Sequence, residues 1–239
     1  MDEDSLIRER AFHNQIFSTE GRAKVGRFYA AAEGALTFYS LLLRKNGPKR
    51  ECLEYGCGLE ANSSRFLAKL GAKVHGIDIS DVAIKVCTDS IGGDFRVMDA
   101  HKMSFSDQTF DLVCGSGILH HLDLAKAYSE VARVLRPNGK AIFLEPMGHN
   151  PVFNLYRRLS PELRTVDEHP LKVRDLRLAR KYFRDAKFHF FALSTFAAVP
   201  FRNTLLFAPV GRLCSLADSL LFTTPLKLWA WIVVMELSN

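Results

Sequence analysis

Between residues 51 and 146 the chain alternates short apolar stretches with stretches of helical spacing, and this alternation limits the fold more than any other feature. The predicted strands are ECLEYGC, AKVHGIDI, DFRVMDA, FDLVCGSG and GKAIFLEP, with helices predicted at residues 62–70, 80–90 and 123–136. Strand–helix alternation with short connections predicts an α/β fold whose parallel sheet is covered on both faces. In such sheets ligands bind beyond the carboxyl ends of the strands.

The flanking segments are predicted to elaborate this core. Apolar residues at helical spacing between Val25 and Leu43 predict a helix, and we assign residues 1–48 to an N-terminal helical cap. Residues 49–239 form the main domain, with cap insertions at about 146–170 and 194–226. The last third is predicted to hold a helix at 175–183, a strand at 187–193 and a final strand at 226–237.

Composition excludes several classes of protein. With 239 residues, 48% of them hydrophobic, the chain is long enough for one domain with a substantial core. Its five cysteines form no CxxC pair, which indicates a reduced, cytoplasmic protein without a zinc site. No cleavable signal is recognised, and uncharged runs are too short to span a bilayer. The net charge of +6 comes mostly from residues 157–187, but no basic motif with interleaved aromatics indicates nucleic-acid binding.

The stretch LEYGCGLEANSSRF, residues 53–66, runs from a strand through two glycines into a helix, where nucleotide cofactors are usually held. Gly56 and Gly58 let a ligand approach the backbone closely. However, Glu54 precedes the turn, and Glu60 replaces the third glycine of a dinucleotide site. A pyrophosphate beside Glu54 would be repelled by roughly several kcal/mol, whereas a cationic ligand would be attracted.

S-adenosylmethionine fits this charge pattern, because it carries an ammonium and a sulfonium and no phosphate. The helix N-terminus after the turn is expected to favour its carboxylate. Asp78, beside Ile79, ends the second predicted strand, where a carboxylate can accept both ribose hydroxyls. Asp99 ends the third strand, where it can accept from the adenine amino group while Ala100 offers its amide. Either aspartate alone could be a helix cap, but together with Glu54 they favour the cofactor.

Five ordered motifs, LEYGCG, GIDIS, VMDAHKMSFSDQTFDLV, ILHHL and VLRPNGKAIFLEP, resemble the class I S-adenosylmethionine-dependent methyltransferases. The chain is most similar to the small-molecule type 11 group, which includes quinone and natural-product enzymes. The resemblance implies a Rossmann-like seven-stranded sheet, mostly parallel, with the last strand antiparallel. It implies cofactor contacts at the three acids, at Gly56 and Gly58, and at a turn formed by Gly115 and Ser116. Cys57 is included with them, although it could simply be a packing residue. Glu60 departs from the family, which often has a small residue there.

Methyl transfer to a hydroxyl needs a group that removes the proton. His120 and His121 follow the fourth predicted strand, where related O-methyltransferases use a histidine as base. Neighbouring side chains point differently, so at most one should face the acceptor, and either could be structural. Glu145 and His149 follow the fifth strand and are further candidates. The Asn-Pro pair at 150–151 predicts a helix start instead.

A metal ion is not expected. Asp167, Glu168 and His169 carry suitable side chains, but consecutive residues rarely converge on one ion.

If the resemblance holds, the N-terminal cap and both insertions gather at the strand ends and enclose the acceptor. Six phenylalanines between 190 and 222 make this enclosure apolar. We therefore expect the acceptor to be a hydrophobic small molecule, such as an aromatic or isoprenoid-like metabolite, with or without an anionic group. The 194–226 segment could be a lid, a homodimer interface or a peripheral membrane contact.

Five functions compete. Methyl transfer to an oxygen is the leading prediction, and C-methylation of an aromatic or isoprenoid-like substrate is the alternative. A protein or nucleic-acid methyltransferase is third, although CGSG stands after the fourth strand where methyltransferases of base amino groups carry the motif (D/N)PPY. A non-catalytic S-adenosylmethionine-binding protein is a fourth option. A nicotinamide-dependent dehydrogenase is disfavoured by the acids at 54 and 60.

Overall fold

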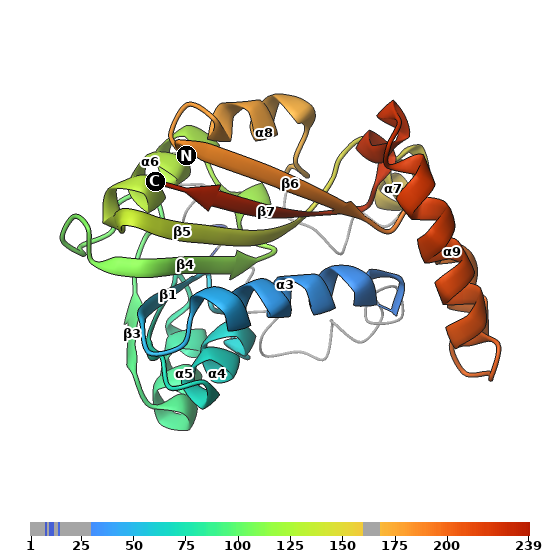
Figure 1. The fold of residues 1–239 in the computed structure, drawn as a ribbon. Helices are drawn as coiled ribbons and strands as arrows, with labels where there is room; N and C mark the ends of the chain where they lie inside the picture. The colour runs from blue at the N-terminus through green and yellow to red at the C-terminus, as the bar shows by residue number, and fades with distance from the viewer. Residues whose placement is uncertain (1–7, 9, 12–13, 15–29, 160–167) are drawn as a thin grey trace.

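A computed structural model describes residues 8, 10, 11, 14, 30–159 and 168–239. Its centre is a seven-stranded sheet of order β3-β2-β1-β4-β5-β7-β6 (Figure 1). The strands are β1 (Glu51–Tyr55), β2 (Lys73–Asp78), β3 (Asp94–Val97), β4 (Phe110–Ser116), β5 (Leu135–Pro146), β6 (Asp185–Phe191) and β7 (Ile232–Ser238). Only β7 runs antiparallel to its neighbours in this sheet. The predicted α/β architecture with an antiparallel last strand is therefore confirmed.

Helices cover both faces of the sheet. The helices of one face are α3 (Glu33–Asn46), α4 (Asn62–Lys69) and α5 (Asp81–Ile91), and those of the other are α6 (Leu124–Val134) and α8 (Val173–Ala179) (Figure 1). Further elements are the short 3-10 helices η1 (Ala30–Ala32) and η2 (Leu119–His121) and the helix α7 (Pro151–Leu159). This arrangement leaves the carboxyl ends of β1 to β5 together at one edge.

The two hydrophobic cores follow from side-chain alternation along the central strands. In β5, Ala141 and Phe143 join the core under α6 and α8, whereas Ile142 and Leu144 join the core under α3 and α4. The inner residues of β7 alternate in the same way. Because successive side chains of a strand point to opposite faces, a continuous apolar run is what a sheet covered on both sides requires.

The predicted helix starts are confirmed by their caps. The Ser80 hydroxyl accepts a hydrogen bond from the Ala83 amide at 3.1 Å, which begins α5. The Asp123 carboxylate accepts from the Ala125 amide at 3.1 Å, which begins α6. The Asn150 side chain accepts from the amide of the third residue of α7, so its structural role is confirmed. Each cap satisfies an amide that the first helical turn leaves without an intrahelical partner.

Several element boundaries shift by a few residues from the prediction, and two segments differ in the type of secondary structure. The Pro-Asn-Gly segment at 137–139 does not separate a helix from a strand, because β5 already begins at Leu135 and passes through it with Asn138 at a positive φ of 65°. The predicted strand at 226–237 is divided: its first part is a 3-10 helix, η5 (Pro225–Trp229), and only β7 is extended.

The described part of the predicted N-terminal cap packs on the sheet. Ala35, Tyr39, Leu42 and Leu43 of α3 are buried in the core shared with β5 and β7. Helix α3 therefore covers one face of the sheet, whereas η1 before it contacts η4 (Thr195–Phe201), where the Thr195 hydroxyl donates to the Ala31 carbonyl at 3.0 Å. Most of residues 1–29, including Val25 of the predicted helix, lie outside the described residues.

The segment predicted as the 194–226 insertion forms helices, of which η4 packs on the core of the sheet through Phe196 and α9 (Phe207–Leu221) extends away from it (Figure 1). The segment continues into η5. Helix α9 packs against η4 and extends away from the sheet beyond the carboxyl ends of the strands (Figure 1). Within the described part of the chain, no helix combines the length and apolar character needed to cross a bilayer.

Candidate active site

The glycine turn after β1 is held tightly between β1, β2 and the segment after β4. The amides of Gly56 and Cys57 both donate to the Ile77 carbonyl at 2.9 Å, and the Gly58 amide donates to Asp78 at 2.8 Å. Gly56 has a φ of +72°, and a Cβ there would lie 2.6 Å from the Ile118 side chain. Only glycine fits this position, so the turn presents bare backbone at the strand ends.

Glu54 is turned into the protein. Its two carboxylate oxygens accept from the amides of Ser63 and Ser64 at 3.1 and 2.8 Å, at the N-terminus of α4. Burial raises the pKa of the Glu54 carboxyl, and the hydrogen bonds from Ser64 and Ser63 oppose this shift. The N-terminus of α4 was expected to bind the carboxylate of the cofactor. Its Ser63 and Ser64 amides instead bind the Glu54 carboxylate. Contact between Glu54 and the cofactor stays a prediction.

Asp78 is the last residue of β2, whereas Asp99 lies two residues beyond the end of β3 and does not end that strand as predicted. Both side chains are half-buried. Asp78 accepts from the Ser80 amide at 2.9 Å in addition to the Gly58 amide. Asp99 uses one oxygen to accept from the backbone amide and to contact Nδ1 of His101, both at 2.8 Å. Each carboxylate is thus fixed in orientation by local backbone and retains lone pairs for a ligand.

The remaining predicted cofactor residues frame the same edge. Ile79 and Ala100 follow the two aspartates and are partly buried, and the Ala100 carbonyl accepts from the Tyr55 hydroxyl at 2.5 Å. Cys57 is buried, and a hydrogen bond with the Cys87 thiol together with burial raises its pKa, as befits a neutral packing thiol. Its assignment as a cofactor contact stays a prediction.

Gly115 and Ser116 are placed differently from the prediction of a turn after the fourth strand. They are the last two residues of β4 itself, and the chain turns at Gly117, whose φ is +69°. A Cβ on Gly115 would lie 2.8 Å from the Tyr55 carbonyl, so a glycine is needed for β4 to lie close to β1.

The donors and acceptors of this edge fit S-adenosylmethionine better than a dinucleotide. Asp78 and Asp99 can accept hydroxyl and amino hydrogens, and no lysine or arginine pairs with either within the ranges the structure describes. Those two acids would repel a pyrophosphate at close range. The bare backbone at Gly56 supplies space where any Cβ would clash.

Glu145 and His120 form the best-defined acid–base pair of the candidate site. Glu145 is fully buried, and Oε2 lies 2.7 Å from Nδ1 of His120. Its Oε1 accepts from the amides of Ile118 and Leu119 at 2.9 and 2.8 Å. Since a carboxylate only accepts, Nδ1 of His120 carries the hydrogen, and its Nε2 keeps the lone pair.

His121 and Glu168 lie beside this pair. Ligand atoms of His120, His121 and Glu168 are all within 4.8 Å of one another, so among the residues that the structure describes these side chains could hold a cation. However, Oε1 of Glu168 already accepts from Arg157 at 2.6 Å in a largely buried ion pair. A cation would have to compete with this guanidinium. The expectation of no metal stays a prediction, and Asp167 lies outside the described residues.

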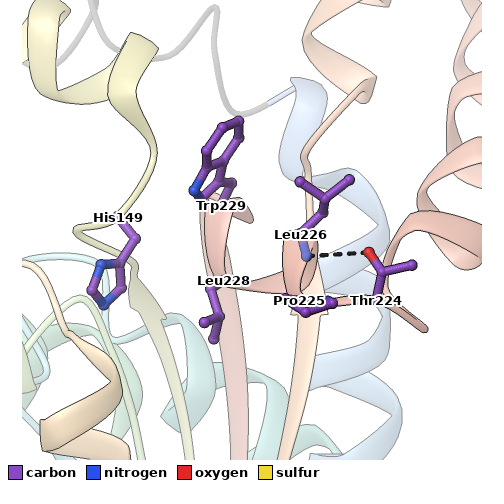
Figure 2. A pocket seen from close by; sticks show the side chains of 6 residues that line it. All are labelled: His149, Thr224, Pro225, Leu226, Leu228 and Trp229. Atoms are coloured by element: carbon purple, nitrogen blue, oxygen red, sulfur yellow. Dashed lines mark hydrogen bonds between the residues drawn. The ribbon is translucent and has the colours of Figure 1, made fainter.

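His149 lines an open groove of about 560 Å³ just beyond the end of β5. The opposite wall comes from η5, and Figure 2 shows His149 facing Leu228 and Trp229 across it. The Nε2 atom of His149 accepts from the Val173 amide at 3.2 Å, so that nitrogen is already engaged. The groove is apolar apart from this imidazole and Thr224, and a hydrophobic ligand suits it.

Two contributors to the site were not identified from the sequence. Ile118 joins the cofactor turn to the acid–base pair, because its side chain lies against Gly56 while its amide donates to Glu145. Trp229 lines the groove although the sequence indicated a strand there. Ile118 begins the ILHHL motif, but its contacts with Gly56 and Glu145 are distant in sequence, and no local pattern predicts them. No local pattern predicts the place of Trp229 either.

A sheet with this strand order, a glycine turn after β1 and carboxylates at or just beyond the ends of β2 and β3 are features of the class I S-adenosylmethionine-dependent methyltransferase fold. Residues 53–143 match the methyltransferase-domain family. Residues 53–143 of the chain accordingly form a methyltransferase domain similar to the type 11 group, whose cofactor is S-adenosylmethionine.

Relatives of known function share this region. A demethylmenaquinone methyltransferase of Chlorobaculum parvum is 40% identical over 90 residues, 36% of this chain and 37% of that protein. A tocopherol O-methyltransferase of Arabidopsis thaliana is 36% identical over 104 residues, 40% of this chain and 30% of that protein. The matches thus span about a third of each relative.

A solved structure extends the similarity to the whole fold. Phosphoethanolamine N-methyltransferase 2 of Haemonchus contortus, in complex with S-adenosyl-L-methionine, superposes with a TM-score of 0.62 at 16% identity. The superposition covers 95% of this chain and 60% of that one.

Proposed function

We propose that the protein transfers the methyl group of S-adenosylmethionine to an oxygen of a hydrophobic, aromatic or isoprenoid-like small molecule. The observation that carries the proposal is the buried Glu145–His120 pair, which lies directly beside the cofactor turn through Ile118. Such a pair suits an acceptor that must lose a proton as it is methylated.

In this proposal Glu145 orients His120 and does not itself take the proton. Three donated hydrogen bonds hold its carboxylate in place and fix the His120 ring with Nε2 available. Nε2 then accepts the acceptor's hydroxyl proton, and Glu145 stabilises the imidazolium that forms. Asp78 and Asp99 hold the adenosine part of the cofactor, which supplies an electrophilic methyl group when bound.

The hydrophobic acceptor is supported by two independent observations. The groove between His149 and η5 is mostly apolar and lies at the carboxyl edge of the sheet. The two relatives in Chlorobaculum parvum and Arabidopsis thaliana are named for demethylmenaquinone and tocopherol. We further propose that the protein acts in the cytoplasm and that nucleic acid is not its substrate.

The test is an acceptor panel in which S-adenosylhomocysteine release is measured. Prenylated and unprenylated hydroquinones with free hydroxyls form one arm, and the same compounds with both hydroxyls already methylated form the other. We expect turnover only in the first arm, with mass spectrometry placing the new methyl on oxygen. A product methylated on carbon would favour C-methylation, and cofactor binding without any turnover across lipophilic phenols would favour a non-catalytic role.

A further inference from the structure

A set of large apolar side chains lies exposed on the helices between β6 and β7. We call residues 195–229, which comprise η4, α9 and η5, the apolar arm. Leu213, Leu216 and Leu220 of α9 are 66 to 73% exposed, and Leu205 before it is 97% exposed. Spacings of three and four residues place the three helical leucines on one face. Since burying a leucine side chain is favourable, leaving this face in water is unfavourable.

The leucine face cannot turn inward, because the opposite face of α9 is fixed. Asp218 is buried and accepts from the amides of Leu193 and Ser194 at 3.0 and 2.7 Å. The Ser194 hydroxyl in turn donates to the Cys214 carbonyl at 2.9 Å. Rotating α9 would break these bonds and leave a carboxylate unpaired, so the leucines are held pointing outward.

The charges of the arm select its partner. Its charged residues are Arg202, Arg212 and Lys227, all exposed, and Asp218, which is buried. The surface of the arm therefore carries three positive charges and no exposed negative one. An isologous dimer through this face would bring basic residues together, whereas an anionic lipid surface complements them.

The base of the arm joins this surface to the groove. Leu226 and Trp229 are both partly exposed and both line the groove beside His149 (Figure 2). Tryptophan is favoured where an apolar medium meets water. A hydrophobic molecule dissolved in a bilayer could therefore enter the groove along the arm without passing through bulk water.

We propose that the apolar arm docks the protein on an anionic membrane surface, with Leu213, Leu216 and Leu220 inserted among the lipids. The arm lies on the bilayer rather than spanning it, as expected for a short helix with a hydrophobic face and basic residues. Delivery of the acceptor from the lipid rests on the proposed function, but docking itself does not.

The experiment measures vesicle binding by the full chain without acceptor or cofactor. Phosphatidylcholine vesicles with and without phosphatidylserine are floated with the protein at low and high salt. We expect binding to the phosphatidylserine vesicles that weakens with salt. The triple variant Leu213→Ser/Leu216→Ser/Leu220→Ser should bind the phosphatidylserine vesicles at least tenfold more weakly than the wild type. The variant Arg212→Gln/Lys227→Gln should bind the same vesicles about tenfold more weakly, with no change for vesicles of phosphatidylcholine alone.

The matched control is Leu41→Ser/Val86→Ser, which removes two exposed apolar side chains from α3 and α5. It should bind vesicles like the wild type. Equal binding by the triple variant and the wild type would overturn the proposal. The proposal would also be overturned if the wild type did not bind vesicles but formed a dimer in solution, and if this dimer were lost in the triple variant. S-adenosylmethionine affinity, measured by calorimetry, should be unchanged in every variant, so failure of docking is distinguishable from failure of the proposed function.

Discussion

Nδ1 of His120 lies 2.7 Å from Oε2 of Glu145, and this hydrogen bond fixes the histidine that we assign as base. His120→Ala should therefore lower kcat by about 10²- to 10⁴-fold, the usual contribution of a general base. Glu145→Gln should lower kcat less, because the ring keeps a partner but loses the charge that stabilises its protonated form. Steady-state kinetics should show these losses in kcat.

Calorimetry with S-adenosylmethionine should show nearly unchanged affinity in both variants, since neither side chain is assigned to the cofactor. Ser129→Ala, an exposed change on α6, serves as the control and should leave kcat unaltered. If His120→Ala kept full activity, the assignment of His120 as base would be wrong, and His121 and His149 would be the next candidates.

The cofactor turn offers a test in which backbone strain and steric clash can be separated. Gly56→Ala would place a Cβ 2.6 Å from Ile118 at a φ of +72°, whereas Gly71→Ala has a φ of +79° with nothing within 4 Å. Both variants should lose about 1–2 kcal/mol of unfolding free energy from the backbone alone. Only Gly56→Ala should also lose more than tenfold in cofactor affinity.

The double variant Gly56→Ala/Ile118→Ala removes the closest atoms and should recover part of this affinity. Urea unfolding and calorimetry together make the comparison. Equal cofactor affinity in the two single variants would show that the contact between residue 56 and Ile118 does not shape the site.

The two aspartates at the strand ends are predicted to hold the adenosine part of the cofactor. Asp78→Asn and Asp99→Asn should each weaken S-adenosylmethionine binding by about 10- to 100-fold, because a hydrogen bond to a charged group contributes about 1.5–3 kcal/mol. Asp89→Asn, an exposed change on α5, is the control and should bind normally. If calorimetry finds that Asp78→Asn and Asp99→Asn bind S-adenosylmethionine as tightly as the wild type and the Asp89→Asn control, this assignment is wrong.

The segment after β3 is tied to α6 by Arg133, which predicts an acid-sensitive part of the stability. Arg133 donates to Glu130 at 2.8 Å and to the carbonyls of Met103 and Phe105 at 2.9 and 2.7 Å. The hydrogen bond from Arg133 lowers the pKa of Glu130 below its usual 4.5. Stability from Glu130 should thus be complete above pH 4.5 and be lost as the pH falls through its lowered pKa.

Chemical unfolding at several pH values measures this contribution. Glu130→Gln should be less stable than the wild type at neutral pH, and the difference should shrink in acid. Asp89→Asn again serves as the control. A constant difference between Glu130→Gln and the wild type at all pH values would show that the charge of Glu130 does not matter.

The parts of the fold and site that could be predicted are those set by local sequence. The Asp123 and Asn150 caps, the alternation along β5 and the position of Asp78 all follow from the identity of a few neighbouring residues. The orientation of Glu54 does not. Its carboxylate can face a ligand or the start of α4 with the same sequence, and packing alone decides that it binds Ser64.

The arm could be recognised from its composition but not placed. The apolar residues between 194 and 226 indicated a lid, a dimer interface or a membrane contact, but they did not predict the helix at 207–221. The buried Asp218 determines which face of that helix points outward, and its partners are Leu193 and Ser194, about 25 residues earlier. A contact of this range leaves no signal in a window of local sequence.

The two chain ends of the arm meet, since the Trp231 amide donates to the Ala192 carbonyl at 3.0 Å. Everything between them is therefore, in terms of connectivity, one long hairpin loop joining two paired antiparallel strands. Such a loop can be shortened, lengthened or exchanged during evolution while the sheet keeps its register. Exchange of this loop could therefore change the surface on which the protein docks and the molecules that reach its groove, without disturbing the residues proposed to bind the methyl donor.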